Sequence, residues 1–97
     1  MMYRLSIAPV AYTDIERIKM RLSCFYPGTP ARFHSALRKG FHNIKTNPHI
    51  AQAYPDNPKF RRLVVGDYLV FYVVNEDKKT VEIRRILHGS QDSEHYI

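Results

Sequence analysis

The stretch FRRLVVGDYLVFYVV, residues 60–74, decides the fold of this chain. β-Branched and aromatic residues fill its two halves, 60–65 and 68–74, and only Gly66 and Asp67 separate them. A two-residue loop of this composition between two such runs is typical of a tight β-hairpin. The second half is apolar throughout, which predicts a strand that is covered on both faces.

Further strands are predicted on both sides of the hairpin. Residues 75–79 form a looser turn, and residues 80–88 are expected to supply the last strand. Residues 3–8 alternate apolar and polar side chains, which is the period of a half-buried strand. Residues 49–59 are rich in Pro, Asn and Asp and predict an irregular loop.

A first amphipathic helix is predicted after the opening strand. Asp14, Arg17 and Arg21 are expected to face away from its apolar stripe. The helix is predicted to begin near Pro9, with a capping box at residues 13–16 as the alternative start. The stripe has spacings of four and three residues, as one helical face requires: Ala11, Ile15, Ile18, Leu22 and Phe25.

A second helix of the same kind follows. Thr29 is predicted as its N-cap with Pro30 at the first helical position, and residues 46–48 end it. Gly40 lies within this helix and costs about 1 kcal/mol relative to alanine, which predicts a neighbouring backbone close to it. The apolar residues of the helix are Phe33, Leu37, Gly40, Phe41 and Ile44.

The predicted order is therefore β-α-α-β-β-β, an α+β fold in which a helical hairpin covers one face of a small, mostly antiparallel sheet. With 97 residues the chain is expected to form a single domain, residues 1–97. Cys24 is the only cysteine, so the chain forms no internal disulfide, and Cys24 is expected to pack.

The charge of the chain points to an acidic or polyanionic partner. It has 15 Lys and Arg against 9 Asp and Glu, a formal charge of +6. An excess of this size raises the local concentration of nucleic acid or of acidic proteins. The opening residues lack the apolar stretch of a signal peptide, and no window approaches the length of a membrane span. A cytoplasmic protein that neither binds a membrane nor needs a cofactor is expected.

The order of elements and four segments of the sequence resemble one family. These segments are IAPVAYTDIERI, NPHIAQAY, FRRLVVGDYLVFYVV and VEIRRILHGSQD. Together they are similar to the RelE/ParE superfamily of bacterial toxins from type II toxin–antitoxin pairs, over essentially the whole chain. The resemblance implies growth inhibition, a role in plasmid stabilisation, and neutralisation by a cognate antitoxin.

The family resemblance also implies where the antitoxin binds. Antitoxin segments in this family dock along the helical hairpin and the sheet, and a groove there suits an acidic amphipathic segment. The alternative is that the two helices only cover their own sheet, and both can hold together. The side chains expected to contact the antitoxin are Ile15, Ile18, Leu22, Phe33 and Leu37.

The family divides by activity, and the resemblance leaves two targets open. RelE-type members cut messenger RNA in the ribosomal A site, whereas ParE-type members inhibit DNA gyrase. The nuclease type has an arginine where this chain has Leu69, and a second arginine where it has Ser90. His95 and Tyr96 retain a capacity for proton transfer, so they are the expected catalytic residues if the chain is a nuclease. The missing arginines favour the gyrase type, and a decayed toxin that only binds its antitoxin is a further alternative.

Basic residues of the strands are the expected contacts to the target. Strand alternation places Arg61 opposite in direction to Arg62, and Arg85, with Val81 and Ile83, opposite to Arg84 and Ile86. His88 most often packs or bonds to backbone in such a position, and residues 91–92 are expected to tie the tail to the sheet. A zinc site is not expected, because no third ligand lies near His88 and His95. The expected target-binding residues are Arg61, Arg62, Arg84, Arg85 and His88.

Overall fold

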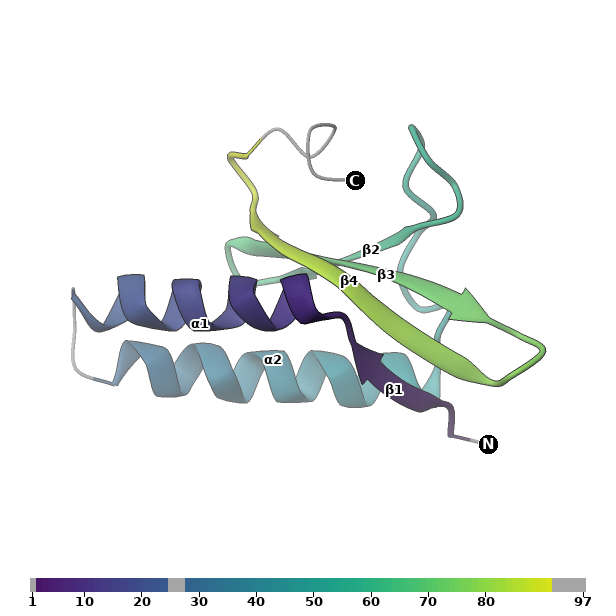
Figure 1. The fold of residues 1–97 in the computed structure, drawn as a ribbon, viewed down its shortest axis with the longest axis horizontal. Helices are drawn as coiled ribbons and strands as arrows, with labels where there is room; N and C mark the ends of the chain where they lie inside the picture. Colours follow the sequence, from purple (N-terminus) through teal and green to yellow (C-terminus); the bar gives the residue numbers. More distant parts are fainter. Residues whose placement is uncertain (1, 25–27, 92–97) are drawn as a thin grey trace.

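A helical hairpin lies against one face of a four-stranded sheet in the computed structural model, which describes residues 2–24 and 28–91 (Figure 1). The elements follow the predicted order, so the predicted α+β architecture is confirmed. The helices are α1 (Pro9–Ser23) and α2 (Thr29–Thr46), and the strands are β1 (Arg4–Ile7), β2 (Arg61–Val65), β3 (Tyr68–Asn75) and β4 (Thr80–His88).

The strands lie in the order β1-β4-β3-β2. Both hairpin pairs, β2–β3 and β3–β4, are antiparallel, and β1 runs parallel to β4. Gly66 has a φ of 60°, the positive value that the first residue of a type II′ hairpin turn requires. The parallel pair places the first strand of the chain beside the last one, and α1 and α2 connect β1 to β2 at the opposite edge of the sheet (Figure 1).

Two apolar clusters lie on opposite faces of the sheet, and β3 contributes to both. Val70 and Tyr72 join the larger cluster beneath the helices, whereas Phe71 joins a smaller one on the other face. All three are fully buried, which confirms that both faces of this strand are covered. Burying a side chain of this size stabilises the fold by about 1.5–3 kcal/mol. The smaller cluster consists of Tyr54, Phe60, Phe71 and Leu87.

A β-bulge in β4 changes which face its residues occupy. Phe71 lies opposite Arg85, but its neighbour Tyr72 lies opposite Ile83, so Arg84 is an extra residue in β4. Because of this extra residue, Ile86 joins the same cluster as Ile83. The prediction that Arg85 shares a face with Ile83, and that Ile86 lies on the opposite one, is therefore wrong beyond the bulge.

The helix ends differ in detail from the predicted ones. α1 begins at Pro9, as predicted, and the Thr13 hydroxyl donates to the Pro9 carbonyl oxygen rather than forming a capping box. α2 begins one residue earlier than predicted, because Gly28 is its N-cap and has a φ of 87°. Thr29 is thus the first helical residue. Cys24, which was expected to pack, is exposed at the end of α1.

Gly40 contacts side chains rather than a backbone. A Cβ at this position would lie 3.2 Å from Val65 Cγ2 and 3.3 Å from Leu63 Cδ2, both on β2. The expected neighbouring backbone is therefore replaced by two side chains of the sheet. The absence of a side chain still serves the predicted purpose, since it lets α2 approach β2 closely.

Hydrogen bonds hold the irregular segment before β2 against the edge of the sheet. The Arg61 guanidinium donates to the Ala51 carbonyl oxygen at 2.6 Å, and the Arg62 amide donates to the Gln52 carbonyl oxygen. Farther back, the Tyr72 hydroxyl donates to the Pro48 carbonyl oxygen at 2.7 Å. The segment is irregular as predicted, and these bonds cover part of the outer edge of β2.

Candidate functional site

The five basic residues predicted to contact the target do not form one site. Arg61 is held by the Ala51 carbonyl oxygen, on the side of the larger cluster. Arg85 forms a bidentate ion pair within the protein, and the His88 ring packs edge-on against Tyr68. These three groups have structural partners, which reduces what they can offer to a ligand.

Arg62 and Arg84 lie on the face of the sheet that the helices leave uncovered. The Arg62 guanidinium lies 5.3 Å from the centre of the Tyr54 ring, and that of Arg84 lies 5.8 Å from the centre of the Phe60 ring. Arg84 also pairs with Glu82 at 3.2 Å. Cation–π contacts of this kind hold the two guanidinium groups above the smaller apolar cluster.

Asp14 is buried, which corrects the prediction that it faces away from the apolar stripe. Its side chain is 3% exposed and accepts hydrogen bonds from Arg85 Nε, Arg85 Nη2 and the Ile86 amide, at 2.8 to 2.9 Å. A buried carboxylate needs this degree of pairing because its desolvation costs several kcal/mol, about the gain that a well-formed pair returns. Asp14 thereby joins α1 to β4 at the bulge.

The sequence does indicate that Asp14 is buried. Asp14 lies three residues after Ala11 and four before Ile18, so helical periodicity places it on the apolar stripe. Only the charge of Asp14 favoured a position on the solvent-exposed face of the helix. The partner could not be identified in the same way, because Arg85 lies 71 residues away and competes with the other arginines and lysines of the strands and loops.

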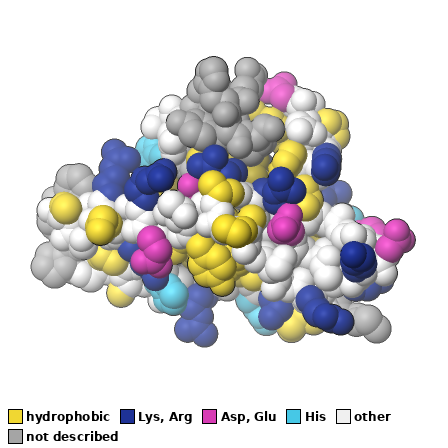
Figure 2. All heavy atoms as spheres, viewed as in Figure 1, with side chains coloured by type: hydrophobic (Ala, Val, Ile, Leu, Met, Phe, Trp, Pro, Cys, Tyr) yellow, Lys and Arg dark blue, Asp and Glu magenta, His cyan; other side chains and the backbone are white. Residues whose placement is uncertain are grey.

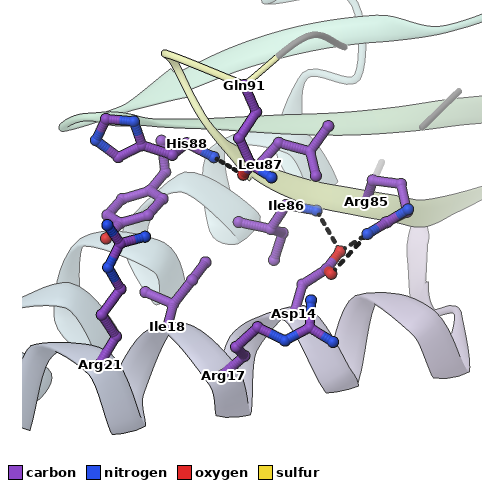
Figure 3. Close-up of a pocket in the computed structure, with 10 residues that line it drawn as sticks. Asp14, Arg17, Ile18, Arg21, Arg85, Ile86, Leu87, His88 and Gln91 are labelled. Atoms are coloured by element: carbon purple, nitrogen blue, oxygen red, sulfur yellow. Dashed lines mark hydrogen bonds and ion pairs between the residues drawn. The ribbon is translucent and has the colours of Figure 1, made fainter. Parts of the chain in front are cut away.

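A pocket of about 190 Å³ lies beside this ion pair, between α1 and the end of β4 (Figure 3). Arg17 and Arg21 rise from α1 on one side, and His88 and Gln91 lie at the end of β4 on the other. Ile18, Ile86, Leu87 and Tyr68 form the apolar part of the wall. We call this site the α1–β4 pocket.

The α1–β4 pocket carries a positive charge that no described residue neutralises. Arg85 offsets Asp14 at its base, while Arg17 and Arg21 are exposed and form no ion pair with any described residue. Figure 2 shows Lys and Arg side chains gathered over α1 in this region. Sequence reasoning assigned these two arginines to a solvated face and missed their convergence with His88.

Gln91 and Ser90 shape the end of β4. The Gln91 Oε1 atom accepts from the His88 amide at 2.8 Å, which confirms the predicted tie between the tail and the sheet for this residue. The Ser90 amide donates to His88 Nδ1 at 3.1 Å, and the Ser90 hydroxyl lies 2.7 Å from the same nitrogen. Asp92, His95 and Tyr96 lie outside the described residues.

Four of the five residues predicted to contact an antitoxin are buried in the protein's own core. Ile15, Ile18, Phe33 and Leu37 are at most 8% exposed, and Leu22 is half-buried against them. They pack against the sheet, as the alternative interpretation holds. Two of them, Ile15 and Leu37, also contribute to a groove between the helices.

This groove is apolar, has a volume of about 230 Å³ and runs between α1 and α2. Figure 2 shows hydrophobic side chains gathered where the two helices lie side by side. Tyr12, which is 56% exposed, contributes to the groove with Phe41, while Lys19 and Arg38 add positive charge. We call it the helix groove. Its lining also includes Ile7, Ile15, Glu16, His34 and Leu37.

Within residues 2–24 and 28–91, no three His, Cys, Asp or Glu side chains are close enough to hold a metal ion. In the same part of the chain, neither helix is long and apolar enough to cross a membrane.

Comparisons with known proteins identify the family. Residues 5–93 match the family described as the ParE toxin of the type II toxin–antitoxin system parDE. No match is found among curated proteins. Several solved structures of low sequence identity share the fold.

One similar structure is the chromosomal ParDE system of P. aeruginosa, with 16% identity, 90% of this chain and 96% of that chain covered, and a TM-score of 0.75. A RelBE toxin–antitoxin complex of Mycobacterium tuberculosis has 17% identity, coverages of 91% and 99%, and a TM-score of 0.68. The isolated RelE toxin of E. coli has 13% identity, coverages of 96% and 90%, and a TM-score of 0.65. The family match spans nearly the whole chain, and the protein belongs to the ParE toxin family of type II toxin–antitoxin systems, within the RelE/ParE superfamily.

Proposed function

We propose that this toxin arrests growth by binding DNA gyrase and that a cognate antitoxin neutralises it. The observation that carries the proposal is that two positions at which ribosome-dependent members of the superfamily have arginines hold uncharged residues in this chain. Here they are Leu69 and Ser90, and both take part in the protein's own structure.

Leu69 packs against the smaller apolar cluster and lies opposite Leu87 on one side and Val64 on the other. Ser90 bonds the imidazole of His88. Removing one preorganised donor to a transition state commonly slows an enzyme by about 10²–10³-fold. Two such losses disfavour a nuclease, whereas an inhibitor that acts by binding needs no such donors.

The helix groove suits the antitoxin. It combines apolar side chains with Lys19 and Arg38, so an amphipathic helix with acidic flanking residues would complement it in shape and charge. Structures similar to this chain include toxin–antitoxin complexes, such as that of M. tuberculosis. The antitoxin is therefore expected to bind in the helix groove, whose lining includes Ile15 and Leu37 of the buried stripe.

A second candidate function is cleavage of ribosome-bound messenger RNA. Arg62 and Arg84 favour it, since both guanidinium groups lie over aromatic rings on the uncovered face of the sheet. A pair of arginines on one face can contact the phosphate backbone of a single RNA strand. Catalysis would then require proton transfer by His95 or Tyr96.

Two assays with the purified toxin separate these functions. If gyrase is the target, the toxin inhibits supercoiling of relaxed plasmid, leaves ribosome-bound messenger RNA intact, and makes cells filamentous before they stop growing. His95→Ala and Tyr96→Phe should leave this inhibition unchanged.

Codon-phased cleavage in the A site, lost in those two variants, would instead establish the nuclease and contradict the proposal. A chain that neither arrests growth nor affects either assay, yet still binds its antitoxin, would be a decayed toxin.

A further inference from the structure

We infer that the α1–β4 pocket binds a phosphate group of a nucleic acid strand, with Arg17 and Arg21 as its principal ligands. The inference rests on the proposed function, because a gyrase–DNA complex offers such a strand beside the protein target. It also assigns the phosphate contact to helix α1 rather than to the arginines of the strands, which interact with other groups of the protein.

Arg17 and Arg21 pair with no acidic side chain of residues 2–24 and 28–91. Arg17 and Arg21 lie four residues apart, on adjacent turns of the same face of α1. Like charges at this spacing repel each other and lower the stability of a helix. Neither arginine forms an ion pair with any described residue, so an anion bound between them would relieve the repulsion.

Two further donors lie across the pocket from the arginines (Figure 3). Because the Ser90 amide donates to His88 Nδ1, a neutral His88 ring carries its proton on Nε2. The Gln91 Oε1 atom is already an acceptor for the His88 amide, which leaves the Gln91 amide nitrogen to donate. The pocket therefore presents donors from α1 and from β4.

The carboxylate at the base of the pocket does not cancel this preference. Asp14 Oδ1 and Oδ2 accept three hydrogen bonds in total, two of them from Arg85. The charges of this pair offset each other, and Arg17 and Arg21 supply the remaining two positive charges. An approaching anion thus meets a net positive site.

The geometry of the donors favours phosphate over carboxylate. A carboxylate offers two oxygens in one plane, whereas a phosphate group is tetrahedral and its free oxygens can be reached from several directions. Guanidinium groups bind phosphate through paired hydrogen bonds, and donors on both sides of the pocket can reach different oxygens of one group. A volume of about 190 Å³ accommodates a phosphate with part of its sugar.

The test compares two variants that lose the same charge. Arg17→Gln/Arg21→Gln removes the arginines of the pocket, and Arg4→Gln/Arg32→Gln removes two exposed arginines that line neither the pocket nor the helix groove. All are surface substitutions, and circular dichroism checks that both variants fold. Binding of the purified full chain to a fluorescein-labelled single-stranded decamer, as DNA and as RNA, is followed by fluorescence anisotropy at several salt concentrations.

The pocket variant is expected to bind the decamer at least tenfold more weakly, and the control variant within about twofold of the wild type. Loss of one phosphate contact to a single strand should lower the slope of log affinity against log salt by about 0.7. Inorganic phosphate should compete with the decamer on the wild type. Arg17→Lys/Arg21→Lys should restore only part of the affinity, since lysine keeps the charge without the paired hydrogen bonds.

Equal weakening in the two glutamine variants would overturn the inference, because it would show a diffuse electrostatic effect. No binding by the wild type, or tighter binding of a glutamate decamer that depends on Arg17 and Arg21, would also overturn it; the latter would make the pocket a site for an acidic protein. This binding assay contains no gyrase. A toxin that fails to inhibit gyrase but shows the expected difference between variants would contradict the proposed function alone.

Discussion

Asp14 is the buried carboxylate on which the contact between α1 and β4 depends. Asp14→Ala is expected to lower the free energy of unfolding by about 3–5 kcal/mol, because it removes the carboxylate of a mostly buried ion pair with Arg85. Chemical denaturation measures the change. Glu16→Ala, on the exposed side of the same helix, is the matched control and should change stability by less than about 0.5 kcal/mol. A small effect of Asp14→Ala would show that the ion pair contributes little.

Tyr72 is the residue whose hydroxyl joins the core to the segment before β2. Tyr72→Phe removes its bond to the buried Pro48 carbonyl oxygen and should cost about 1–3 kcal/mol, while Tyr12→Phe, at an exposed position, should have little effect. Burial is the main reason that the pKa of Tyr72 is raised. Its neutral form therefore stabilises the fold fully below the unfolded pKa of about 10, and this contribution is lost as the pH rises through the folded pKa.

Denaturation midpoints of the wild type and Tyr72→Phe, measured from pH 8 to pH 11, test this dependence. The wild type should lose stability more steeply than the variant at the alkaline end. Parallel curves would contradict it.

At the scale of the elements, α2 approaches β2 closely because Gly40 has no side chain. Alanine there gains about 1 kcal/mol of helix propensity, but its Cβ would press on Val65 at 3.2 Å, and overpacking costs about 1–3 kcal/mol. Gly40→Ala is therefore expected to destabilise the wild type slightly and to stabilise a Leu63→Ala/Val65→Ala background, in which both crowding side chains are shortened. A double-mutant cycle by chemical denaturation measures this coupling. The same sign in both backgrounds would exclude the close approach as the reason for glycine.

The β3–β4 turn is joined to the first strand and to the segment before β2 by Glu76. Its carboxylate accepts from the Tyr3 hydroxyl and lies 2.7 Å from His49 Nε2, with Lys79 at 3.5 Å. The hydrogen bond from Tyr3 is the main reason that the pKa of Glu76 is lowered, and His49 and Lys79 add to it. Its contribution to stability is thus present above the unfolded pKa and lost as the pH falls through the lowered folded pKa.

Glu76→Gln should therefore lower the denaturation midpoint at pH 7 and lower it less at pH 3, because the contribution of the wild-type carboxylate declines as the pH falls toward and through its lowered pKa. Asp77→Asn, at the neighbouring exposed position, is the matched control and should have little effect at either pH. An equal loss at both values would point to packing rather than charge.

At the scale of the whole molecule, the antitoxin and the nucleic acid are expected to use different surfaces. The helix groove lies on the outer side of the hairpin, and the α1–β4 pocket lies where α1 meets the end of the sheet. Tyr12→Ala should weaken antitoxin binding about tenfold or more, as truncation of an exposed aromatic anchor commonly does. Val64→Ala, at an exposed site on β2, should not. Isothermal titration calorimetry with the cognate antitoxin measures both, and equal affinities would place the antitoxin elsewhere.

The sequence by itself determined the order of the elements, the β2–β3 hairpin and the apolar face of each helix. These features follow from local periodicity and from turn residues such as Gly66, and both act within a few residues of the chain. Even the burial of Asp14 was readable from its place on the α1 stripe. The family resemblance rested on the same local patterns, and the match over residues 5–93 agrees with it.

Only the tertiary structure decided which basic residues are available to a ligand. Arg85 is paired with a carboxylate 71 residues away, and the bulge at Arg84 reverses the facing of the residues after it. Ion pairs and bulges depend on which segments meet in space, so periodicity along one segment does not predict them. Among the residues that the structure describes, Arg17 and Arg21 have no acidic partner, and they lie beside the end of β4; for this reason the candidate phosphate site lies there and not on the strands.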